Sequence, residues 1–170
     1  MAQIHLLVAG VMLCSLPACS LDGDLPWIHS LEKQEIFMLL RQLERIPSQS
    51  CLKDRTDFKF PWGRENIPEM QRTEDACFHH EMLRQIINLF NTKDSHAAWK
   101  NTLLEQLLSR LDHGLERLEQ MEGENLACPS LGIIVRKYFQ RIYRFLKEKK
   151  FTLCAWEIVR VEMKRCLSIM

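Results

Sequence analysis

The chain has 170 residues, of which 46% are hydrophobic and 26% are charged. This balance is ordinary for one soluble globular domain with enough chain to bury a core. The net charge of +1 at pH 7 gives no overall attraction to nucleic acid or to a membrane surface. Glycine and proline number six each, and the hydrophobic residues fall mostly at helical spacing, so the sequence predicts an all-α fold.

The first twenty residues have the pattern of a secretory signal peptide. Residues 4–13 form an apolar run of suitable length that is too short to span a bilayer. Small residues at the −3 and −1 positions predict cleavage before Leu21, and cleavage after Ala18 is the alternative. No later segment is a candidate for a membrane-spanning helix. We therefore expect a secreted protein with one helical domain at residues 21–170.

The first predicted helix covers Trp27 to Ile46 and ends before Pro47, because proline disfavours helical geometry in the residue that precedes it. The residues expected to face inward are Leu31, Ile36, Leu39, Leu40 and Leu43. Residues 47–72 then form a long connection with two further prolines and a glycine. A loop of this length in a compact domain is usually functional or crosses over the fold.

The second predicted helix covers Glu74 to Asn91. Thr73, with Asp75 nearby, can begin it. The residues expected to face inward are Met82, Ile86, Leu89 and Phe90.

Asp94 or Ser95 can cap a third helix that continues to about Met121. Its leucines alternate steps of four and three, which is the spacing of a packed bundle seam: Leu104, Leu108, Leu111, Leu115 and Leu118. Residues 123–130 contain both glycine and proline and are expected to interrupt the helical pattern.

The last long stretch, Leu131 to Ser168, holds two apolar-periodic segments separated by residues 147–153. Steps of three and four between the hydrophobic residues indicate one face of an α-helix in each segment. In the first, Leu131, Val135, Tyr138, Ile142 and Phe145 lie opposite Arg136, Lys137, Gln140, Arg141 and Arg144. In the second, the stripe is Ala155, Trp156, Val159, Met163 and Leu167, and the polar residues are Glu157, Arg160, Glu162, Lys164 and Arg165. Five amphipathic helices with a long first crossover suit a bundle with one or two overhand connections.

The sequence contains no residue set that is typical of catalysis or metal binding. Cys77, His79 and His80 are close together, but they lack the paired spacings of structural zinc sites. There is no glycine-rich phosphate loop and no nucleophile elbow, and the carboxylates are scattered along the helices without a converging pair. We predict a protein that is not an enzyme, with no catalytic residue, no metal and no cofactor.

Three blocks of sequence resemble the type I interferon family. The most specific contains residues 135–142 (VRKYFQRI), 146–150 (LKEKK) and 154–157 (CAWE). The others are 51–58 (CLKDRTDF) and a group made of 80–82 (HEM), 88–90 (NLF), 92–95 (TKDS) and 97–99 (AAW). With Asp24-Leu25-Pro26 near the start, the resemblance covers essentially the whole mature chain. Within the family, the short tail and the short loop before Leu131 are most similar to interferon delta, the short trophoblast interferon of hoofed mammals.

The resemblance implies an up-up-down-down helical cytokine bundle of five helices with a long first crossover loop. It also implies a secreted monomer that binds both chains of the type I interferon receptor and pairs them. This pairing would activate JAK-STAT signalling, with antiviral, antiproliferative or reproductive effects. One alternative is an interferon-like helical cytokine with a different receptor. Another is a module that binds heparin or nucleic acid through residues 136–150, against which the near-neutral net charge argues. We expect no nucleic-acid partner and no membrane insertion.

After cleavage before Leu21, five cysteines remain: Cys51, Cys77, Cys128, Cys154 and Cys166. An odd number in a secreted protein leaves a free or intermolecular thiol. The resemblance implies a disulfide between Cys51 and Cys154. The bridge would close a loop of about 100 residues and stabilise the fold by roughly 4–5 kcal/mol in the chain-entropy model.

The second disulfide of the family is absent here, because Gly23 and Met121 stand at its two positions. If cleavage follows Ala18, Cys19 becomes the first residue, and we consider a bridge from it to Cys128. For Cys77 and Cys166 we expect buried or free thiols, with Cys77 acting as a small hydrophobic residue near a helix start.

The resemblance also implies two receptor-binding faces. The first joins Leu52 and Arg55 of the long connection to Arg160, Glu162 and Arg165 of the last helix, with the Cys51–Cys154 bridge holding these segments side by side. Arginine suits such a face because its planar guanidinium pairs readily with carboxylates. Arg160→Ala is expected to weaken binding by roughly 1–3 kcal/mol without unfolding the bundle. The alternative for the helix residues is an ordinary solvated helix face.

The second face is expected to contain Asn88, Arg136, Lys137 and Gln140. Relatives carry aromatic residues along this side of the second and third helices, where this chain has Ile87, Leu108 and Asp112. These departures place the affinity for the second receptor chain in doubt, since a carboxylate disrupts an apolar contact. An ordinary basic helix face is the alternative for this set as well.

Overall fold

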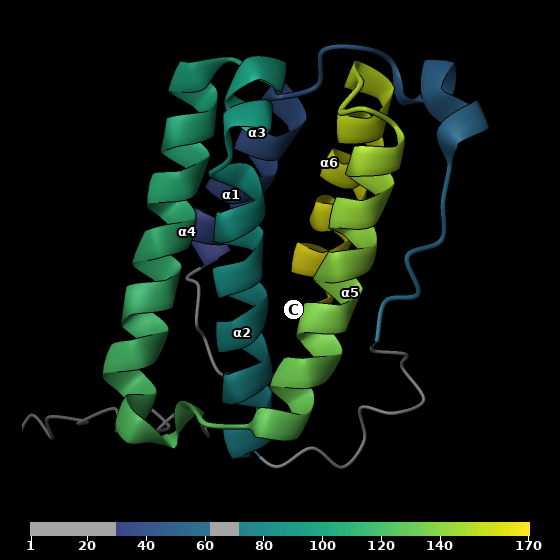
Figure 1. Cartoon of the computed structure of the whole chain (residues 1–170). Coiled ribbons are helices and arrows are strands. Elements are labelled where there is room, and N and C mark those ends of the chain that lie inside the picture. Colours follow the sequence, from purple (N-terminus) through teal and green to yellow (C-terminus); the bar gives the residue numbers. More distant parts are fainter. Residues whose placement is uncertain (1–29, 62–71) are drawn as a thin grey trace, which may run out of the picture.

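The computed structural model describes residues 30–61 and 72–170, and all regular structure in these two ranges is helical (Figure 1). The α-helices are α1 (Ser30–Gln42), α2 (Arg72–Phe90), α3 (Lys93–Ala98), α4 (Asn101–Glu122), α5 (Pro129–Glu148) and α6 (Leu153–Ile169). Two 3₁₀ helices, η1 (Ser48–Asp54) and η2 (Gly123–Leu126), lie in the connections. The predicted signal peptide at residues 1–20 lies outside the described residues.

Five long helices form the bundle, and four of them, α1, α2, α4 and α6, have the expected up-up-down-down order (Figure 1). In the figure α1 and α2 run upward, α4 and α6 run downward, and α5 runs upward beside α2. Helix α2 packs against α4 and α5, α1 packs against α4, and η1 packs against α6. The long connection after α1 therefore crosses one end of the bundle and places η1 against the last helix. None of the helices in the described ranges is long and apolar enough to cross a membrane.

The bundle core is built from the hydrophobic stripes of these helices. Every stripe residue predicted for the last helix is buried, and so are Val135, Tyr138, Ile142 and Phe145 of α5. The aromatic rings interlock where the helices converge: the ring centroid of Trp99 lies 5.2 Å from that of Phe90 and 4.9 Å from that of Trp156. The inward-facing residues predicted for α2 are all buried as well.

Leu31 was expected in this core, and that prediction is wrong because its side chain is 72% exposed. The buried residues of α1 start at Ile36. Leu31 precedes Ile36 by five positions, which is about 140° around an α-helix of 3.6 residues per turn. It therefore lies outside the apolar stripe.

The third predicted helix is broken in two. Its cap is Thr92, whose Oγ1 accepts a hydrogen bond from the Ser95 backbone N–H at 3.2 Å, while the Thr92 N–H donates to Ser95 Oγ at 3.1 Å. The resulting short helix α3 ends at Trp99, which adopts an extended backbone (φ −121°, ψ 159°). This break directs the Trp99 ring into the core, and α4 begins afresh at Asn101.

Glycine and proline mark the other boundaries. Gly123 ends α4 with a φ of 57°, in the left-handed region that only glycine adopts without steric cost. Pro129 is the first residue of α5, where its missing N–H is not needed. The tight turn between α5 and α6 uses positive φ angles at Lys150 and Phe151, and Thr152 then caps α6 by accepting from the Ala155 N–H at 3.3 Å.

Candidate functional site

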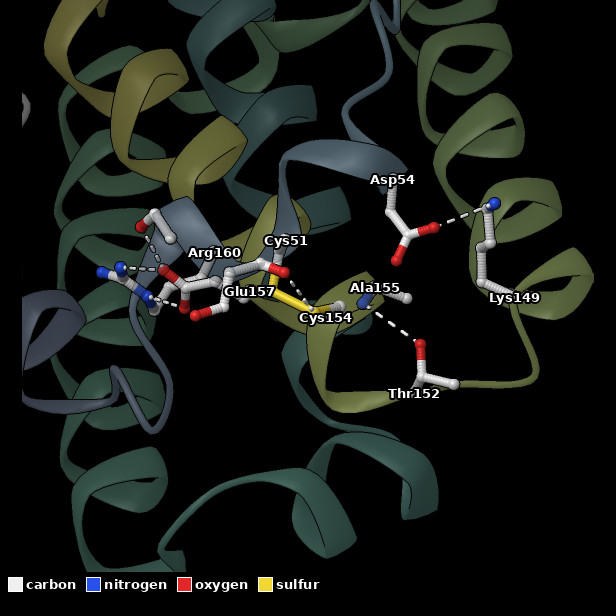
Figure 2. Close-up of a disulfide and its surroundings, with 10 residues drawn as sticks. Cys51, Asp54, Lys149, Thr152, Cys154, Ala155, Glu157 and Arg160 are labelled. Atoms are coloured by element: carbon white, nitrogen blue, oxygen red, sulfur yellow. Dashed lines mark hydrogen bonds and ion pairs between the residues drawn. A yellow bond between two sulfur atoms is a disulfide. The ribbon is translucent and has the colours of Figure 1, made fainter.

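A disulfide fastens η1, in the long connection, to the last helix. Cys51 in η1 is bonded to Cys154 in the first turn of α6, with their Cα atoms 5.1 Å apart (Figure 2). This is the pairing that the family resemblance implied. Beside it, Lys149 Nζ lies 3.1 Å from Asp54 Oδ1, so the end of α5 also holds the end of η1 (Figure 2).

The chain after η1 is held by α5. Arg141 donates from Nε to the Phe58 carbonyl at 2.9 Å and from Nη2 to the Lys59 carbonyl at 3.1 Å. The Phe58 ring is buried edge-on against Phe145, with centroids 5.1 Å apart. A basic residue predicted for the polar face of this helix thus serves to anchor the loop.

A groove of about 640 Å³ lies between the anchored loop and α6. Its loop side runs from Ser48 to Phe58, and its helix side runs from Glu157 to Arg165. Phe58, Ile158 and Val161 supply apolar lining, while Arg55, Asp57 and Arg165 supply charge. A concave apolar surface bordered by a few charged groups is the usual composition of a protein-binding surface.

Four of the five residues predicted for the first face line this groove: Leu52, Arg55, Glu162 and Arg165. Leu52 is 61% exposed and the Arg165 side chain is 57% exposed, so both are open to a partner. Glu162 lies deeper and is buried, with its Oε2 3.7 Å from Arg165 Nη1. The fold therefore brings the loop and helix parts of this set together.

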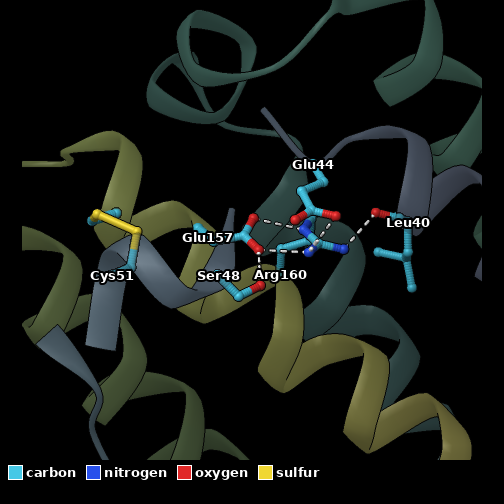
Figure 3. A network of polar contacts seen from close by, with 7 residues as sticks. Leu40, Glu44, Ser48, Cys51, Glu157 and Arg160 are labelled. Atoms are coloured by element: carbon cyan, nitrogen blue, oxygen red, sulfur yellow. Dashed lines mark hydrogen bonds and ion pairs between the residues drawn. A yellow bond between two sulfur atoms is a disulfide. The ribbon is translucent and has the colours of Figure 1, made fainter. Parts of the chain in front are cut away.

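Arg160, the fifth residue, lies elsewhere (Figure 3). Expected on an exposed polar face, it is 4% exposed, and that expectation of exposure is wrong. Its guanidinium donates to the Glu157 carboxylate from Nε at 2.8 Å and from Nη2 at 2.6 Å, and from Nη1 to the Leu40 carbonyl at 2.9 Å. Glu157 also accepts from Ser48 Oγ at 2.6 Å, and Glu44 Oε2 lies 3.8 Å from Arg160 Nη2.

A buried tyrosine of α5 holds the Glu162 carboxylate from the core side. The Tyr138 hydroxyl donates to Glu162 Oε1 at 2.5 Å and lies 3.0 Å from Cys166 Sγ. Burial raises the pKa of the Tyr138 hydroxyl far above its usual range and raises the pKa of the Cys166 thiol to about 12. Both groups are therefore protonated at neutral pH, and Cys166 is the one unpaired cysteine among the described residues.

The four residues predicted for the second face are all exposed on α2 and α5: Asn88, Arg136, Lys137 and Gln140. Arg136 Nη1 lies 3.6 Å from Glu81 Oε1, which links the two helices. A separate polar hollow of about 490 Å³ contains Leu108 and Asp112 on α4. Burial and the neighbouring Glu116 raise the pKa of the Asp112 carboxyl.

A second disulfide joins Cys77 near the start of α2 to Cys128, the residue before α5, with Cα atoms 6.0 Å apart. Two predictions are wrong here. Cys77 is not an unpaired hydrophobic residue, and Cys128 is not available to Cys19. The pairing depends on α2 and α5 packing side by side, which no spacing in the sequence reveals.

No group of three or more His, Cys, Asp or Glu residues in the described ranges is placed to hold a metal ion. His80, which belonged to the cluster considered for zinc, has Nε2 2.9 Å from Glu119 Oε1 and so joins α2 to α4. Sequence reasoning missed Ser48, Glu157 and Tyr138 as parts of the site. The three-residue spacing of Glu157 and Arg160 is typical of an ion pair on one helix, and it was the available signal for the buried pair.

Comparison with known proteins identifies the family. The interferon alpha/beta domain model matches residues 25–170. Human interferon alpha-6 is 44% identical, over 96% of this chain and 90% of that protein. Horse interferon omega-1 is 45% identical, over 98% of this chain and 89% of that protein. The solved structure of zebrafish interferon 2 has the same fold, with a TM-score of 0.67 at 19% identity over 83% of this chain and 96% of that chain. The chain belongs to the type I interferon family, whose members are cytokines and not enzymes.

Proposed function

We propose that this protein is a secreted, monomeric cytokine that binds both chains of the type I interferon receptor and brings them together. The kinases attached to the two receptor chains would then activate each other and start JAK-STAT signalling, with antiviral, antiproliferative or reproductive effects. The observation that carries the proposal is the groove in which Leu52 and Arg55 of the long loop meet Glu162 and Arg165 of α6.

The first face has the composition of a binding hot spot. The exposed apolar residues at the groove, Leu52 and Val161, lie beside Arg55 and Arg165, whose planar guanidinium groups suit carboxylates of a partner. Cys51–Cys154 and Lys149–Asp54 hold the loop part in place. A surface that is ordered before binding loses less conformational entropy when the partner arrives.

The second face is carried by other elements. Asn88 on α2 and Arg136, Lys137 and Gln140 on α5 are exposed polar residues. Because the two faces share no residue, one molecule has separate surfaces for two receptor chains. The proposal also includes secretion directed by a signal peptide at residues 1–20 and a mature domain at residues 21–170. Within the family, it includes a particular resemblance to interferon delta.

The test is surface binding of the secreted protein to each type I interferon receptor ectodomain separately. Arg55→Ala and Arg165→Ala are each expected to weaken binding to one chain by about 10- to 100-fold, the range of hot-spot residues. Lys137→Ala is expected to weaken binding to the other chain only. Lys147→Ala removes an exposed lysine of α5 outside both faces and is the matched control.

Binding to neither chain by a folded protein would contradict the proposal and indicate a different receptor. Binding to heparin alone, steeply reduced by salt, would instead support the basic segment at residues 136–150 as the functional surface.

A further inference from the structure

Glu157 and Arg160 form a charged pair inside the protein. Glu157 is 3% exposed and Arg160 is 4% exposed. Transferring two charges out of water costs several kcal/mol per ion unless their hydrogen-bonding groups are satisfied. Here Nε, Nη1 and Nη2 of Arg160 and both Glu157 oxygens have partners within 2.9 Å. The pair is therefore a well-satisfied internal network and offers little surface to a partner protein.

This network joins three segments that are far apart in the sequence (Figure 3). Arg160 reaches α1 through the Leu40 carbonyl, 120 positions earlier in the chain. Glu157 reaches the first residue of η1 through the Ser48 hydroxyl, 109 positions earlier. Leu52 follows Ser48 by four positions, and Cys51 between them is bonded to Cys154.

The short helix η1 is thus held at three points by three different kinds of contact. At its centre η1 has the disulfide, and at its end Asp54 has Lys149. At its start, the hydrogen bond from Ser48 to Glu157 is the side-chain contact that the structure provides. The anchors at Cys51 and Asp54 fix two points of the segment and leave rotation about the line between them, so the contact at Ser48 completes its orientation.

We propose that Glu157 and Arg160 are positioning residues for the loop half of the first face. Glu157 holds the start of η1 through its hydrogen bond with Ser48, and Arg160 holds Glu157 against the end of α1. Together they orient Leu52 and Arg55 toward the receptor chain. Arg160 then acts on binding through the loop and does not contact the receptor. This inference rests on the proposed function and assigns Arg160 a different role from the one that the family resemblance implied.

Ser48→Ala is the mildest test, because it removes one hydroxyl from an exposed residue. Without this bond the start of η1 samples other orientations, and apparent affinity falls with the fraction of molecules in the competent one. We expect binding to the face-one receptor chain to weaken by about three- to tenfold, with binding to the other chain unchanged. Ser48→Thr keeps the hydroxyl and should bind like the wild type.

Hydrogen exchange of the free protein separates positioning from direct contact. In Ser48→Ala, the amides of residues 48–55 should exchange faster before any receptor is added. Ser50→Ala, two positions along the same 3₁₀ helix, is the matched control and should change neither exchange nor affinity.

Glu157→Gln gives a second route, because Glu157 is 3% exposed and offers a partner almost no surface of its own. In a folded Glu157→Gln protein we expect weaker face-one binding. Adding Ser48→Ala should weaken it little further, because both changes remove the same connection.

Unchanged binding in Ser48→Ala, beside normal binding by the wild type, would overturn the inference alone. Weakened binding with unchanged exchange would also overturn it, because Ser48 would then be a direct contact. Wild-type protein that binds neither chain would overturn both this inference and the proposed function.

Discussion

At the scale of single residues, two arginines of α6 have opposite environments although they are five positions apart. The Arg165 side chain is 57% exposed at the groove, and the Arg160 side chain is 5% exposed in the Glu157 network. A spacing of five places them about 140° apart around the helix. Arg165 is therefore exposed at the groove, and Arg160 points toward the end of α1.

Arg160→Ala should destabilise the protein, contrary to what the sequence suggested. Removing the guanidinium leaves the Glu157 carboxylate buried without its charged partner, which costs about 3–5 kcal/mol. Urea unfolding followed by circular dichroism measures this loss. Arg165→Ala is the control and should change the free energy of unfolding by less than about 1 kcal/mol. Equal stability of the two variants would show that the buried pair contributes little.

At the scale of elements, the Cys77–Cys128 bridge joins the beginnings of two helices that run side by side. Helix α2 packs against α5, and the bridge closes the end at which both helices start (Figure 1). The cysteines are 51 positions apart, so the bridge restricts a long segment of the unfolded chain. It provides a second covalent link beside Cys51–Cys154.

Replacing both Cys77 and Cys128 by alanine should lower the free energy of unfolding by about 4 kcal/mol, as the chain-entropy model estimates for this loop length. Chemical denaturation under non-reducing conditions measures the change. Cys166→Ala, which removes a core thiol without breaking a bridge, should cost about 1 kcal/mol. Peptide mapping of the wild type should recover Cys77 linked to Cys128, and linkage of Cys128 to any other cysteine would contradict the assignment.

At the scale of the whole molecule, the proposed receptor pairing requires both proposed faces on one folded body. A protein that keeps the first face and lacks the second would occupy one receptor chain without recruiting the other. Such a variant is expected to be a competitor, because its binding and its signalling depend on different residues.

Lys137→Glu combined with Gln140→Ala should produce this behaviour. Face-one affinity should stay at the wild-type value, STAT phosphorylation in responsive cells should be lost, and excess variant should block the wild-type protein. The control is Arg55→Ala with Arg165→Ala, which should neither signal nor block. Full signalling by the face-two variant would mean that α5 is not part of the second face.

Much of the fold was predictable from local pattern. Steps of three and four located five helices and most of their buried residues, because helical periodicity is a property of each segment alone. Proline and glycine marked several ends, as Gly123 and Pro129 do. Motif resemblance supplied the Cys51–Cys154 pairing and a predicted first face, and the structure brings four of its five residues together at one groove.

The remaining features depend on which segments meet in three dimensions. A hydrophobic stripe identifies the side of α6 that faces the core. It does not show that η1 and the end of α1 cover Glu157 and Arg160, which lie beside that stripe. The break at Trp99 follows from the space between Phe90 and Trp156, and the Cys77–Cys128 bridge follows from the packing of α2 beside α5. The sequence by itself determined the helices, the family and the residues that carry charge. Only the tertiary structure decided which of those charges are buried and which are exposed, because burial depends on contacts between distant segments.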